Sequence, residues 1–543
     1  MKSAELMVKC LENEGVRTIY GLPGEENLDF LDALLESSIR FIMTRHEQGA
    51  AFMADVQGRL TGDAGVCLST LGPGATNLIT GVADAQLDRA PLVAIAGQAS
   101  TTRLHKESHQ VLDLINLFQP ITKYSASIRE PETLSEVVRK AFKVAETEKP
   151  GACFIELPEN IAGMEAIGEP LKAQKPALPD PPDKKIAQIA SILSKAKRPL
   201  ILAGNGIIRA RASEELKSFA QAWHIPVANT FMAKGVMPLS NSLSLGVVGL
   251  QSHDYVNCGF DSADVIVCIG YDIVEYPPAF WHPNKDRKII HIDTTPAEVD
   301  AHYVLEAGVV ANITESLVAL SKQVQSQCPN WFENLRRQIV QVIQEKNHDE
   351  SFPLKPQRIL SDLRQALKAE DIVICDVGAH KIWTARHYLA EKPNTCIISN
   401  GFASMGIAVP GAIAAKHLYP QQTVVALTGD AGFMMNSQEI ETAMRIQTPL
   451  VILIWTDETY GLIKWKQNNK FGRPSHVDFK NPDFVTYAKS FGAKGYRVNA
   501  ASELLPILKQ AIQDQTVVLI DCPVDYQENL RLTEQLGELV CAI

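Results

Sequence analysis

A single glutamate stands at the start of an otherwise small and apolar helical stretch. Glu47 follows Arg45 and His46, and the residues at 49–54 read GAAFMA. A carboxylate that is buried without a partner is costly, so Glu47 is expected to meet a group with which it can exchange a proton. The alternative is that a glutamate in the first turn only stabilises the helix dipole. The pattern thus predicts either a proton-handling site or a helix-stabilising charge.

Two aspartates follow successive apolar segments near the other end of the chain. Asp430 comes after the strand pattern 423–428, and Asp457 comes after the strand pattern 450–455. One strand-helix-strand unit separates them, and the carboxyl ends of parallel strands form the edge where ligands bind. Carboxylates that converge there beside a helix N-terminus suit Mg²⁺ that bridges to a phosphate. The alternative is that each aspartate merely caps a helix.

The helix expected after Asp430 has a start signal of its own. Asn436 is a favourable N-cap residue, and Glu439 lies three residues further on, which is the spacing of a capping box. Ile440 and Met444 then continue an apolar face. The sequence therefore predicts a helix that has Asn436 as its N-cap residue and forms a capping box with Glu439.

The elements that must position these residues alternate along the whole chain. Short apolar strand patterns, such as 66–70, 92–96 and 153–157, are followed by amphipathic helix patterns. This alternation predicts an α/β fold, in which doubly wound parallel sheets carry helices on both faces.

Length and two breaks in composition divide the chain. At 543 residues it is too long for a single core. Residues 170–182 are rich in proline, and residues 347–356 are polar with two prolines, so both read as connections. We therefore expect three parallel-sheet domains, at 1–165, 185–345 and 356–543.

Composition excludes several classes of function. The net charge is −10, and acidic and basic residues are interspersed, so no basic surface for nucleic acid is expected. No apolar run reaches the roughly 20 residues that a membrane helix requires. Residues 1–6 lack the basic and then apolar regions of a signal peptide. These features predict a cytoplasmic enzyme.

Several further motifs, together with Glu47 and the aspartate pair, carry a resemblance to a known family. The chain resembles the thiamine-diphosphate-dependent 2-oxo-acid enzymes over essentially its whole length, most closely the catalytic subunits of the acetolactate synthase branch. Together the motifs are specific, although each loop alone is a weak signal. They are YGLPG at 20–24, RHEQ at 45–48, LGPGATN at 71–77, His109-Gln110, FQPITK at 118–123 and Ser404-Met405-Gly406 ahead of Pro410.

The resemblance implies a role for the residues that match the family's site. The three sheets would be a pyrimidine-binding, a central and a diphosphate-binding domain. Glu47 matches the glutamate that hydrogen-bonds a ring nitrogen of the cofactor's aminopyrimidine. Asp430, Asp457 and the main-chain oxygen of Thr459 match the Mg²⁺ ligands. The family usually has asparagine where Asp457 stands, and a carboxylate remains a suitable Mg²⁺ ligand.

The resemblance also implies which residues surround thiamine diphosphate. Met405 matches the apolar wedge that bends the cofactor. The residues implied to contact the cofactor are Pro23, Gly24, Gly74, Asn77, Gly378, Ala379, His380, Ser404, Met405, Gly429, Asp430, Ala431 and Gly432.

The resemblance leaves the substrate open. Condensation of two pyruvates to 2-acetolactate and CO2 is expected first, because the match around Phe118 is best to acetolactate synthases. A cation such as Lys466 or Arg473 could instead meet the extra carboxylate of 2-oxoglutarate, which would make the enzyme a decarboxylase that yields succinic semialdehyde. The substrate pocket is expected to contain Gln110, Phe118, Lys123, Leu462, Trp465, Lys466 and Arg473.

The same resemblance bears on whether other cofactors are bound and on the oligomeric state. The segment 269–276 is similar to the catabolic, FAD-independent acetolactate synthases, so FAD is not expected. A nicotinamide-dependent dehydrogenase lacks support, because Gly204-Asn205-Gly206 does not continue as the full dinucleotide-binding motif. Retention of Glu47 argues against a non-catalytic relative that only binds the cofactor. In the family the cofactor bridges two subunits, which implies a homodimer or homotetramer.

Overall fold

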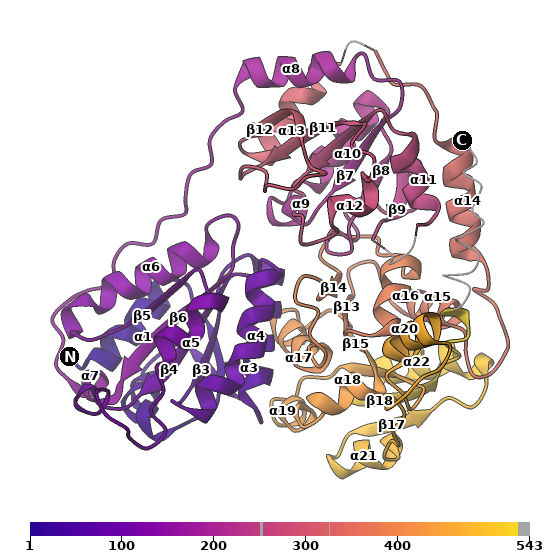
Figure 1. Cartoon of the computed structure of the whole chain (residues 1–543). Coiled ribbons are helices and arrows are strands. Elements are labelled where there is room, and N and C mark those ends of the chain that lie inside the picture. The colour runs from indigo at the N-terminus through magenta and orange to yellow at the C-terminus, as the bar shows by residue number, and fades with distance from the viewer. Residues whose placement is uncertain (250–252, 325, 530–543) are drawn as a thin grey trace.

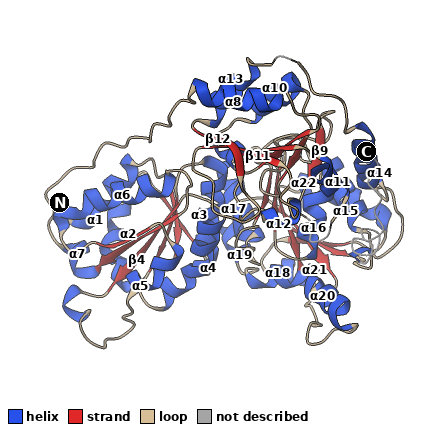
Figure 2. Ribbon diagram, turned by 45° about the horizontal axis from the view of Figure 1, so that its top comes forward, coloured by secondary structure: helices blue, strands red, loops and turns tan. Residues whose placement is uncertain are grey.

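The computed structural model describes residues 1–249, 253–324 and 326–529, which form three units, each built around a six-stranded sheet (Figure 1). The strand pairs of all three sheets are parallel, and helices cover both faces of the strands (Figure 2). The predicted α/β fold of three doubly wound parallel sheets is therefore confirmed. Among the described helices, none combines the length and the apolar composition needed to cross a bilayer.

The first unit contains Glu47. Its strands lie in the order β2-β1-β3-β4-β6-β5. They are β1 (Thr18–Gly21), β2 (Arg40–Met43), β3 (Gly65–Ser69), β4 (Leu92–Gln98), β5 (Tyr124–Ser127) and β6 (Ala152–Pro158). The helices are α1 (Ser3–Asn13), α2 (Leu28–Leu34), α3 (Glu47–Thr61), α4 (Pro73–Leu87), α5 (Leu114–Phe118), α6 (Leu134–Glu146) and α7 (Glu159–Gly163).

The central unit has a different strand order, β12-β11-β10-β7-β8-β9. Its strands are β7 (Pro199–Ala203), β8 (Val227–Asn229), β9 (Ser244–Val247), β10 (Val265–Ile269), β11 (Lys288–Asp293) and β12 (Leu305–Val310). The helices are α8 (Asp183–Leu193), α9 (Gly206–Arg209), α10 (Ser213–Trp223), α11 (Tyr255–Ser262), α12 (Pro278–Trp281), α13 (Ile313–Ser321) and α14 (Glu333–Gln344).

The third unit contains the aspartate pair and repeats the strand order of the first, as β14-β13-β15-β16-β18-β17. Its strands are β13 (Ile372–Cys375), β14 (Cys396–Ile398), β15 (Val424–Gly429), β16 (Val451–Thr456), β17 (Lys494–Arg497) and β18 (Val518–Pro523). The helices are α15 (Pro356–Ala366), α16 (Ala379–His387), α17 (Ala408–Leu418), α18 (Asp430–Met435), α19 (Glu439–Arg445), α20 (Gly461–Phe471), α21 (Phe484–Ser490) and α22 (Leu504–Gln513).

The three sheets occupy separate parts of the chain, 18–158, 199–310 and 372–523. Each part falls within one of the three predicted ranges, 1–165, 185–345 and 356–543, whose boundaries stay predictions. Residues 171–180 carry no regular secondary structure and are exposed, as expected of a proline-rich connection.

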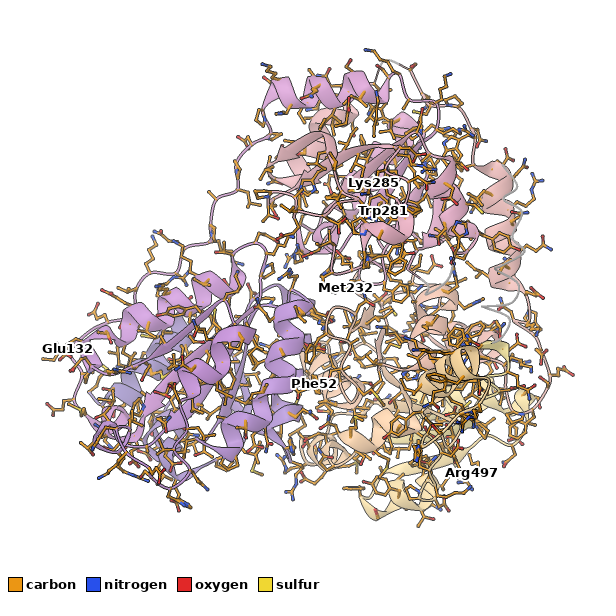
Figure 3. The ribbon with its side chains drawn as sticks, viewed as in Figure 1. Phe52, Glu132, Met232, Trp281, Lys285 and Arg497 are labelled. Carbon is orange, nitrogen blue, oxygen red and sulfur yellow. The ribbon has the colours of Figure 1, made fainter. Side chains whose placement is uncertain are left out.

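The first and third units share one hydrophobic core. Helix α3, which contains several glycines and alanines, packs against α17, and Val56 Cγ2 would lie 2.8 Å from a Cβ atom placed on Gly411. Phe52 is fully buried in this core and lies where the two units meet (Figure 3). Glycine and alanine let the two helices approach closely. This packing fixes α3, and therefore Glu47 at its first residue, against the third unit.

Candidate functional site

Glu47 lies at the carboxyl edge of the first sheet. The chain leaves β2 and enters α3 at Glu47, and His46 caps the helix by accepting a hydrogen bond from the amide of Gln48 at 3.0 Å. The Asn77 Nδ2 atom donates to Glu47 Oε2 at 3.0 Å. Within the described residues Oε1 of this half-buried carboxylate has no hydrogen-bond partner. The geometry leaves one carboxylate oxygen available to a ligand.

Two glycines keep the neighbouring loops close to Glu47. A Cβ atom on Gly74 would lie 3.4 Å from Glu47 Oε1 and 2.9 Å from Thr70 Cγ2, and one on Gly24 would lie 2.3 Å from Thr70 Cβ. Side chains there would collide, so glycine allows the loops after β1 and β3 to meet at this edge. The structure thus places four of the predicted cofactor residues at the same edge as Glu47: Pro23, Gly24, Gly74 and Asn77.

Asp430 begins α18 directly after β15 and is almost completely buried. Its Oδ1 accepts from the Ala431 amide at 2.8 Å, and its Oδ2 accepts from the Glu458 amide and from Asn481 Nδ2, both at 2.8 Å. The amide of Asp457 also approaches Oδ2, at 3.2 Å. These donors orient the carboxylate toward the loop that follows β16. Asn481 carries no motif and was missed from the sequence.

Asp457 stands beside Asp430, as predicted from the two strand ends. Burial raises the pKa of the Asp457 carboxyl to about 8, and the nearby charge of Asp430 adds to the shift. Burial also raises the pKa of Asp430. Two carboxylates that oppose each other in this way are stabilised by a divalent cation between them. The donor set fits Mg²⁺, since it contains only oxygen ligands, with the Thr459 carbonyl two residues beyond Asp457.

His380 lies at the start of α16, beside the glycines that were predicted to face the diphosphate. Its ring is buried, its Nε2 has no hydrogen-bond partner, and burial lowers its pKa to about 3, so the imidazole is neutral. Cβ atoms on Gly378 and Gly429 would lie 2.7 Å and 3.2 Å from its Cε1 atom. A buried polar atom without a partner beside two glycines suits a ligand that accepts or donates a hydrogen bond there.

Asp376 organises this part of the third sheet and was not singled out from the sequence. Its buried carboxylate accepts from the amide of Gly406 at 2.8 Å, from the amide of Val377 at 2.7 Å and from Thr428 Oγ1 at 3.2 Å. Burial raises its pKa to about 6. A Cβ atom on Gly432 would lie 3.1 Å from the carboxyl carbon. Asp376 thus joins the ends of β13 and β15 to the loop that contains Met405.

The loop 404–406 is held from two sides. The Ser404 amide approaches Asp84 Oδ1 at 3.4 Å, and Asp84 also pairs with the buried Arg59 at 2.8 Å. Gly406 has a φ of 94°, which favours glycine, and a Cβ atom there would lie 2.7 Å from Asn436 Nδ2. These contacts fix the backbone on both sides of Met405, the predicted apolar wedge.

The predicted substrate residues of the first unit do not form one group. Phe118 is fully buried and stacks on Phe154, with ring centroids 4.0 Å apart. The Lys123 ammonium donates to the carbonyls of Val144, Thr147 and Lys149 at 2.5 to 2.7 Å, where α6 ends, and burial lowers its pKa. Its three contacts give Lys123 a structural role at the end of that helix.

Gln110 differs from Phe118 and Lys123, because it is exposed. Its φ is 58°, and its carbonyl oxygen would lie 2.7 Å from a Cβ atom on Gly72. The loop that carries it therefore lies against the start of α4, where Gly74 and Asn77 also stand.

Helix α20 carries three of the other predicted substrate residues, and Arg473 follows its C-terminal end. Trp465 is buried, and its Nε1 lacks a hydrogen-bond partner, whereas Leu462 is half-buried. Lys466 and Arg473 are exposed. Lys464 pairs with Asp478 at 2.9 Å. Leu462 and Trp465 thus pack against the core of the third unit, whereas Lys466 remains exposed.

The capping box predicted for Asn436 and Glu439 is wrong. Asn436 ends α18, and α19 begins only at Glu439, with Gln438 as its N-cap residue. The Glu439 carboxylate instead reaches the first unit, where it accepts from the amides of Arg45 and His46. The Glu439 side chain, which the local pattern predicted to cap the helix, thus forms tertiary contacts instead.

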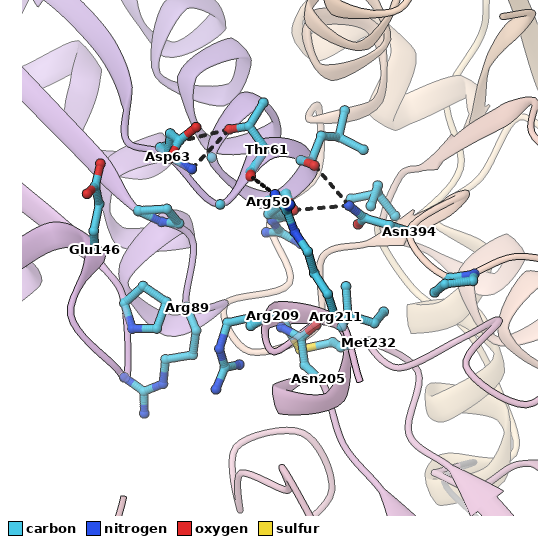
Figure 4. A pocket seen from close by; sticks show the side chains of 18 of the residues that line it. Arg59, Thr61, Asp63, Arg89, Glu146, Asn205, Arg209, Arg211, Met232 and Asn394 are labelled. Atoms are coloured by element: carbon cyan, nitrogen blue, oxygen red, sulfur yellow. Dashed lines mark hydrogen bonds between the residues drawn. The ribbon is translucent and has the colours of Figure 1, made fainter. Parts of the chain in front are cut away.

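A cavity of about 500 Å³ lies away from the predicted site residues (Figure 4). It lies where the three units meet, and Arg211 spans it to donate to the Thr61 carbonyl at 3.2 Å. None of the predicted site residues lines it. The sheet edges around Glu47 and Asp430, and not this cavity, therefore carry the candidate chemistry.

Three family models match the chain, one on each unit. The thiamine pyrophosphate enzyme N-terminal TPP binding domain matches residues 1–117, and the central domain of the same enzymes matches residues 186–320. The C-terminal TPP binding domain matches residues 376–522. The two TPP binding models thus cover the sheets that carry Glu47 and Asp430.

Curated relatives extend the similarity over nearly the full length. Acetolactate synthase of Bacillus subtilis is 35% identical, and the aligned region covers 99% of this chain and 97% of the relative. A probable acetolactate synthase large subunit of Methanocaldococcus jannaschii is 37% identical, over 99% and 94%. The catabolic acetolactate synthase of Raoultella terrigena is 35% identical, over 98% and 97%. The chain therefore belongs to the thiamine pyrophosphate enzyme family, in its acetolactate synthase branch.

Proposed function

We propose that this protein is an acetolactate synthase, which condenses two molecules of pyruvate to 2-acetolactate and CO2. The proposal is carried by the similarity to relatives named acetolactate synthase along nearly the whole of both chains. The orientation of Glu47, Asp430 and His380 at the edges of two sheets with the same strand order supports it.

Glu47 is the proposed proton-handling residue. When bound, thiamine diphosphate supplies the electron sink for decarboxylation of a 2-oxo acid. Asn77 fixes Oε2 of Glu47, and the absence of a side chain on Gly74 keeps the space beside Oε1 open. Oε1 would hold a hydrogen bond to the aminopyrimidine and exchange a proton there.

The third unit would hold the metal and the diphosphate. Asp430, Asp457 and the Thr459 carbonyl are the proposed Mg²⁺ ligands, and Mg²⁺ would neutralise charge on the phosphates. The amides at the starts of α16 and α18 would meet the phosphate oxygens, and His380 Nε2 would gain a partner. The remaining contacts proposed to the cofactor come from Gly378, Ala379, Ser404, Met405, Gly429, Ala431 and Gly432.

We also propose that the active form is a homodimer or a homotetramer. Across the described residues, no hydrogen bond or ion pair joins Glu47 to Asp430 or Asp457. Two large apolar side chains of α18, the helix that begins with Asp430, are exposed. The exposed fractions of Met434 and Met435 are 40% and 44%. A second copy would cover them and bring a glutamate from its own first unit. Sedimentation equilibrium that found only monomer in the active preparation would contradict this proposal.

The central unit supports the proposal that the enzyme works without FAD. In a doubly wound sheet, the turn after the first strand receives the phosphates of a dinucleotide. Here the buried Glu275 carboxylate lies on that turn, where it accepts from the Asn205 amide at 3.0 Å and from Thr230 Oγ1 at 2.5 Å. The Asp272 amide donates to it as well, at 3.0 Å. On this proposal the Glu275 side chain would occupy the position that a phosphate of the dinucleotide would need.

Glu275 provides a prediction about pH and stability. Burial raises its pKa to about 7 from an ordinary value of 4.5. Its proton therefore stabilises the folded state fully below about pH 4.5, and this contribution is lost as the pH rises through about 7. The difference in free energy of unfolding between wild type and Glu275→Gln should fall by on the order of 3 kcal/mol between about pH 5 and about pH 8.

Thermal denaturation of both proteins across this pH range measures the effect. Glu306→Gln, at an exposed position of β12, is the matched control and should follow wild type at every pH. A pH-independent difference between Glu275→Gln and wild type would contradict the prediction.

Product analysis tests the proposed reaction. Purified protein with thiamine diphosphate and Mg²⁺ is offered pyruvate or 2-oxoglutarate in separate reactions. Acetolactate and CO2 from pyruvate are expected. Succinic semialdehyde from 2-oxoglutarate without acetolactate from pyruvate would overturn the proposal, and would favour a role for the exposed cations Lys466 and Arg473.

A further inference from the structure

One short segment of the third unit forms hydrogen bonds with the turn that carries Glu47. The segment 436–445 lies beside the start of α3 (Figure 1). Asn436 Nδ2 donates to Gln48 Oε1 at 3.0 Å, and the Arg445 guanidinium donates to the carbonyl of Met43. Between these two contacts, Glu439 reaches the main chain of the turn itself.

Glu439 binds the two amides that directly precede Glu47. Its Oε1 accepts from the Arg45 amide at 3.1 Å and from the His46 amide at 3.0 Å. Thr442 Oγ1 donates to Oε2 at 2.6 Å, which holds the carboxylate in this orientation. The Arg45 amide also approaches Oε2 at 3.2 Å, and within the described residues neither amide donates to any residue other than Glu439. The acceptor for both therefore comes from another unit of the fold.

The burial of Glu439 indicates a specific function for its carboxylate. The side chain is fully buried, and burial raises its pKa. A buried carboxylate is costly unless several donors meet it. A Cβ atom on Gly49 would lie 2.7 Å from its Oε1, so glycine in the first turn of α3 leaves the space that Glu439 requires.

We propose that Glu439 is a positioning residue for catalysis, because its hydrogen bonds to the Arg45 and His46 amides fix the main chain from which Glu47 projects. The inference rests on the proposed function, since it assigns Glu439 a role only through Glu47. Small displacements of a catalytic group can reduce turnover by on the order of a hundred-fold. Loss of the Glu439 carboxylate would leave the metal ligands and the diphosphate residues in place.

The first test needs no substrate. Hydrogen-deuterium exchange of the peptide that spans 43–49 is compared in wild type, Glu439→Gln and Glu439→Ala. Exchange should rise in Glu439→Ala and rise less in Glu439→Gln, because a neutral amide oxygen accepts weaker hydrogen bonds than a carboxylate. Glu503→Ala is the matched control: Glu503 is an exposed glutamate of the third unit that also accepts from a main-chain amide, that of Asn499 at 2.9 Å. It should exchange as wild type does.

Kinetics of the loaded enzyme then separate positioning from general stability. Glu439→Ala should lower kcat by on the order of a hundred-fold, with KM for pyruvate and the Kd for thiamine diphosphate changed less than about three-fold. Glu439→Gln should recover part of the loss. In a Glu47→Gln background, Glu439→Ala should cost little further activity, because both changes act on one group.

Three results would overturn the inference. They are unchanged exchange at 43–49 in Glu439→Ala, unchanged kcat despite faster exchange, and full additivity with Glu47→Gln. A wild-type protein that makes no acetolactate contradicts the proposed function instead, and the exchange experiment then still decides whether Glu439 holds the turn.

Discussion

Replacement of Glu47 by glutamine is expected to lower turnover of pyruvate by about 10²- to 10⁴-fold, while thiamine diphosphate still binds. Glutamine keeps the shape of the side chain and an oxygen that can accept from Asn77 Nδ2, which lies 3.0 Å from Glu47 Oε2. Glutamine cannot hold and return a proton at the position of Glu47 Oε1. The loss should therefore appear in kcat, with a small change in cofactor affinity.

Steady-state kinetics and titration of the apoenzyme with thiamine diphosphate measure the two quantities separately. Glu159→Gln is the matched control, since Glu159 also opens a helix at the end of a strand of the same sheet and is bonded to the Ser100 amide at 2.9 Å. It should retain wild-type turnover. Glu47→Gln with near wild-type kcat would show that Glu47 is not the proton-handling residue.

Replacement of Asp430 by asparagine is expected to weaken Mg²⁺-dependent binding of thiamine diphosphate by more than a hundred-fold. Changes at residues that merely support a metal ligand cost about 10- to 100-fold in metal affinity, and Asp430 is a proposed direct ligand. The asparagine Nδ2 would also oppose main-chain donors that the carboxylate now accepts, such as the Glu458 amide. Both effects are expected to weaken Mg²⁺-dependent binding of thiamine diphosphate.

Asp457→Asn should have a much smaller effect. An amide oxygen can still bind Mg²⁺, and the change removes the repulsion that contributes to the raised pKa of Asp457. Isothermal titration of the cofactor with and without Mg²⁺, before and after chelation, measures each variant. Glu458→Gln is the control, because this side chain pairs with Lys480 at 2.6 Å, away from Asp430. Wild-type Mg²⁺ dependence in Asp430→Asn would rule out Asp430 as a ligand.

Local patterns predicted the architecture well, because each strand and helix is encoded by a few adjacent residues. The alternation of apolar and amphipathic segments predicted parallel sheets, and the ends of β15 and β16 brought Asp430 and Asp457 together as expected. The same reasoning failed for Glu439. Its spacing from Asn436 matched a capping box, but its carboxylate bonds to amides 393 and 394 positions away.

Residues around the substrate could not be placed from sequence. Phe118 and Lys123 were both predicted in the substrate pocket, yet the first stacks within the core and the second holds the end of α6. Asp376 stands alone after β13 without a recognisable spacing. Its importance comes from donors in two other segments, the loop at Gly406 and the end of β15, which the chain brings together only when folded.

The sequence by itself determined the fold class, the family and the residue types at the reacting centre, because these depend on hydrophobic periodicity and on motifs of a few residues. Only the tertiary structure decided what holds those residues in place. Glu439 on the Glu47 turn, Asp376 beneath the Met405 loop and Glu275 on the central turn are buried carboxylates whose donors lie in other segments. Burial makes an unpaired carboxylate costly, so their partners are set by packing, which no local pattern encodes.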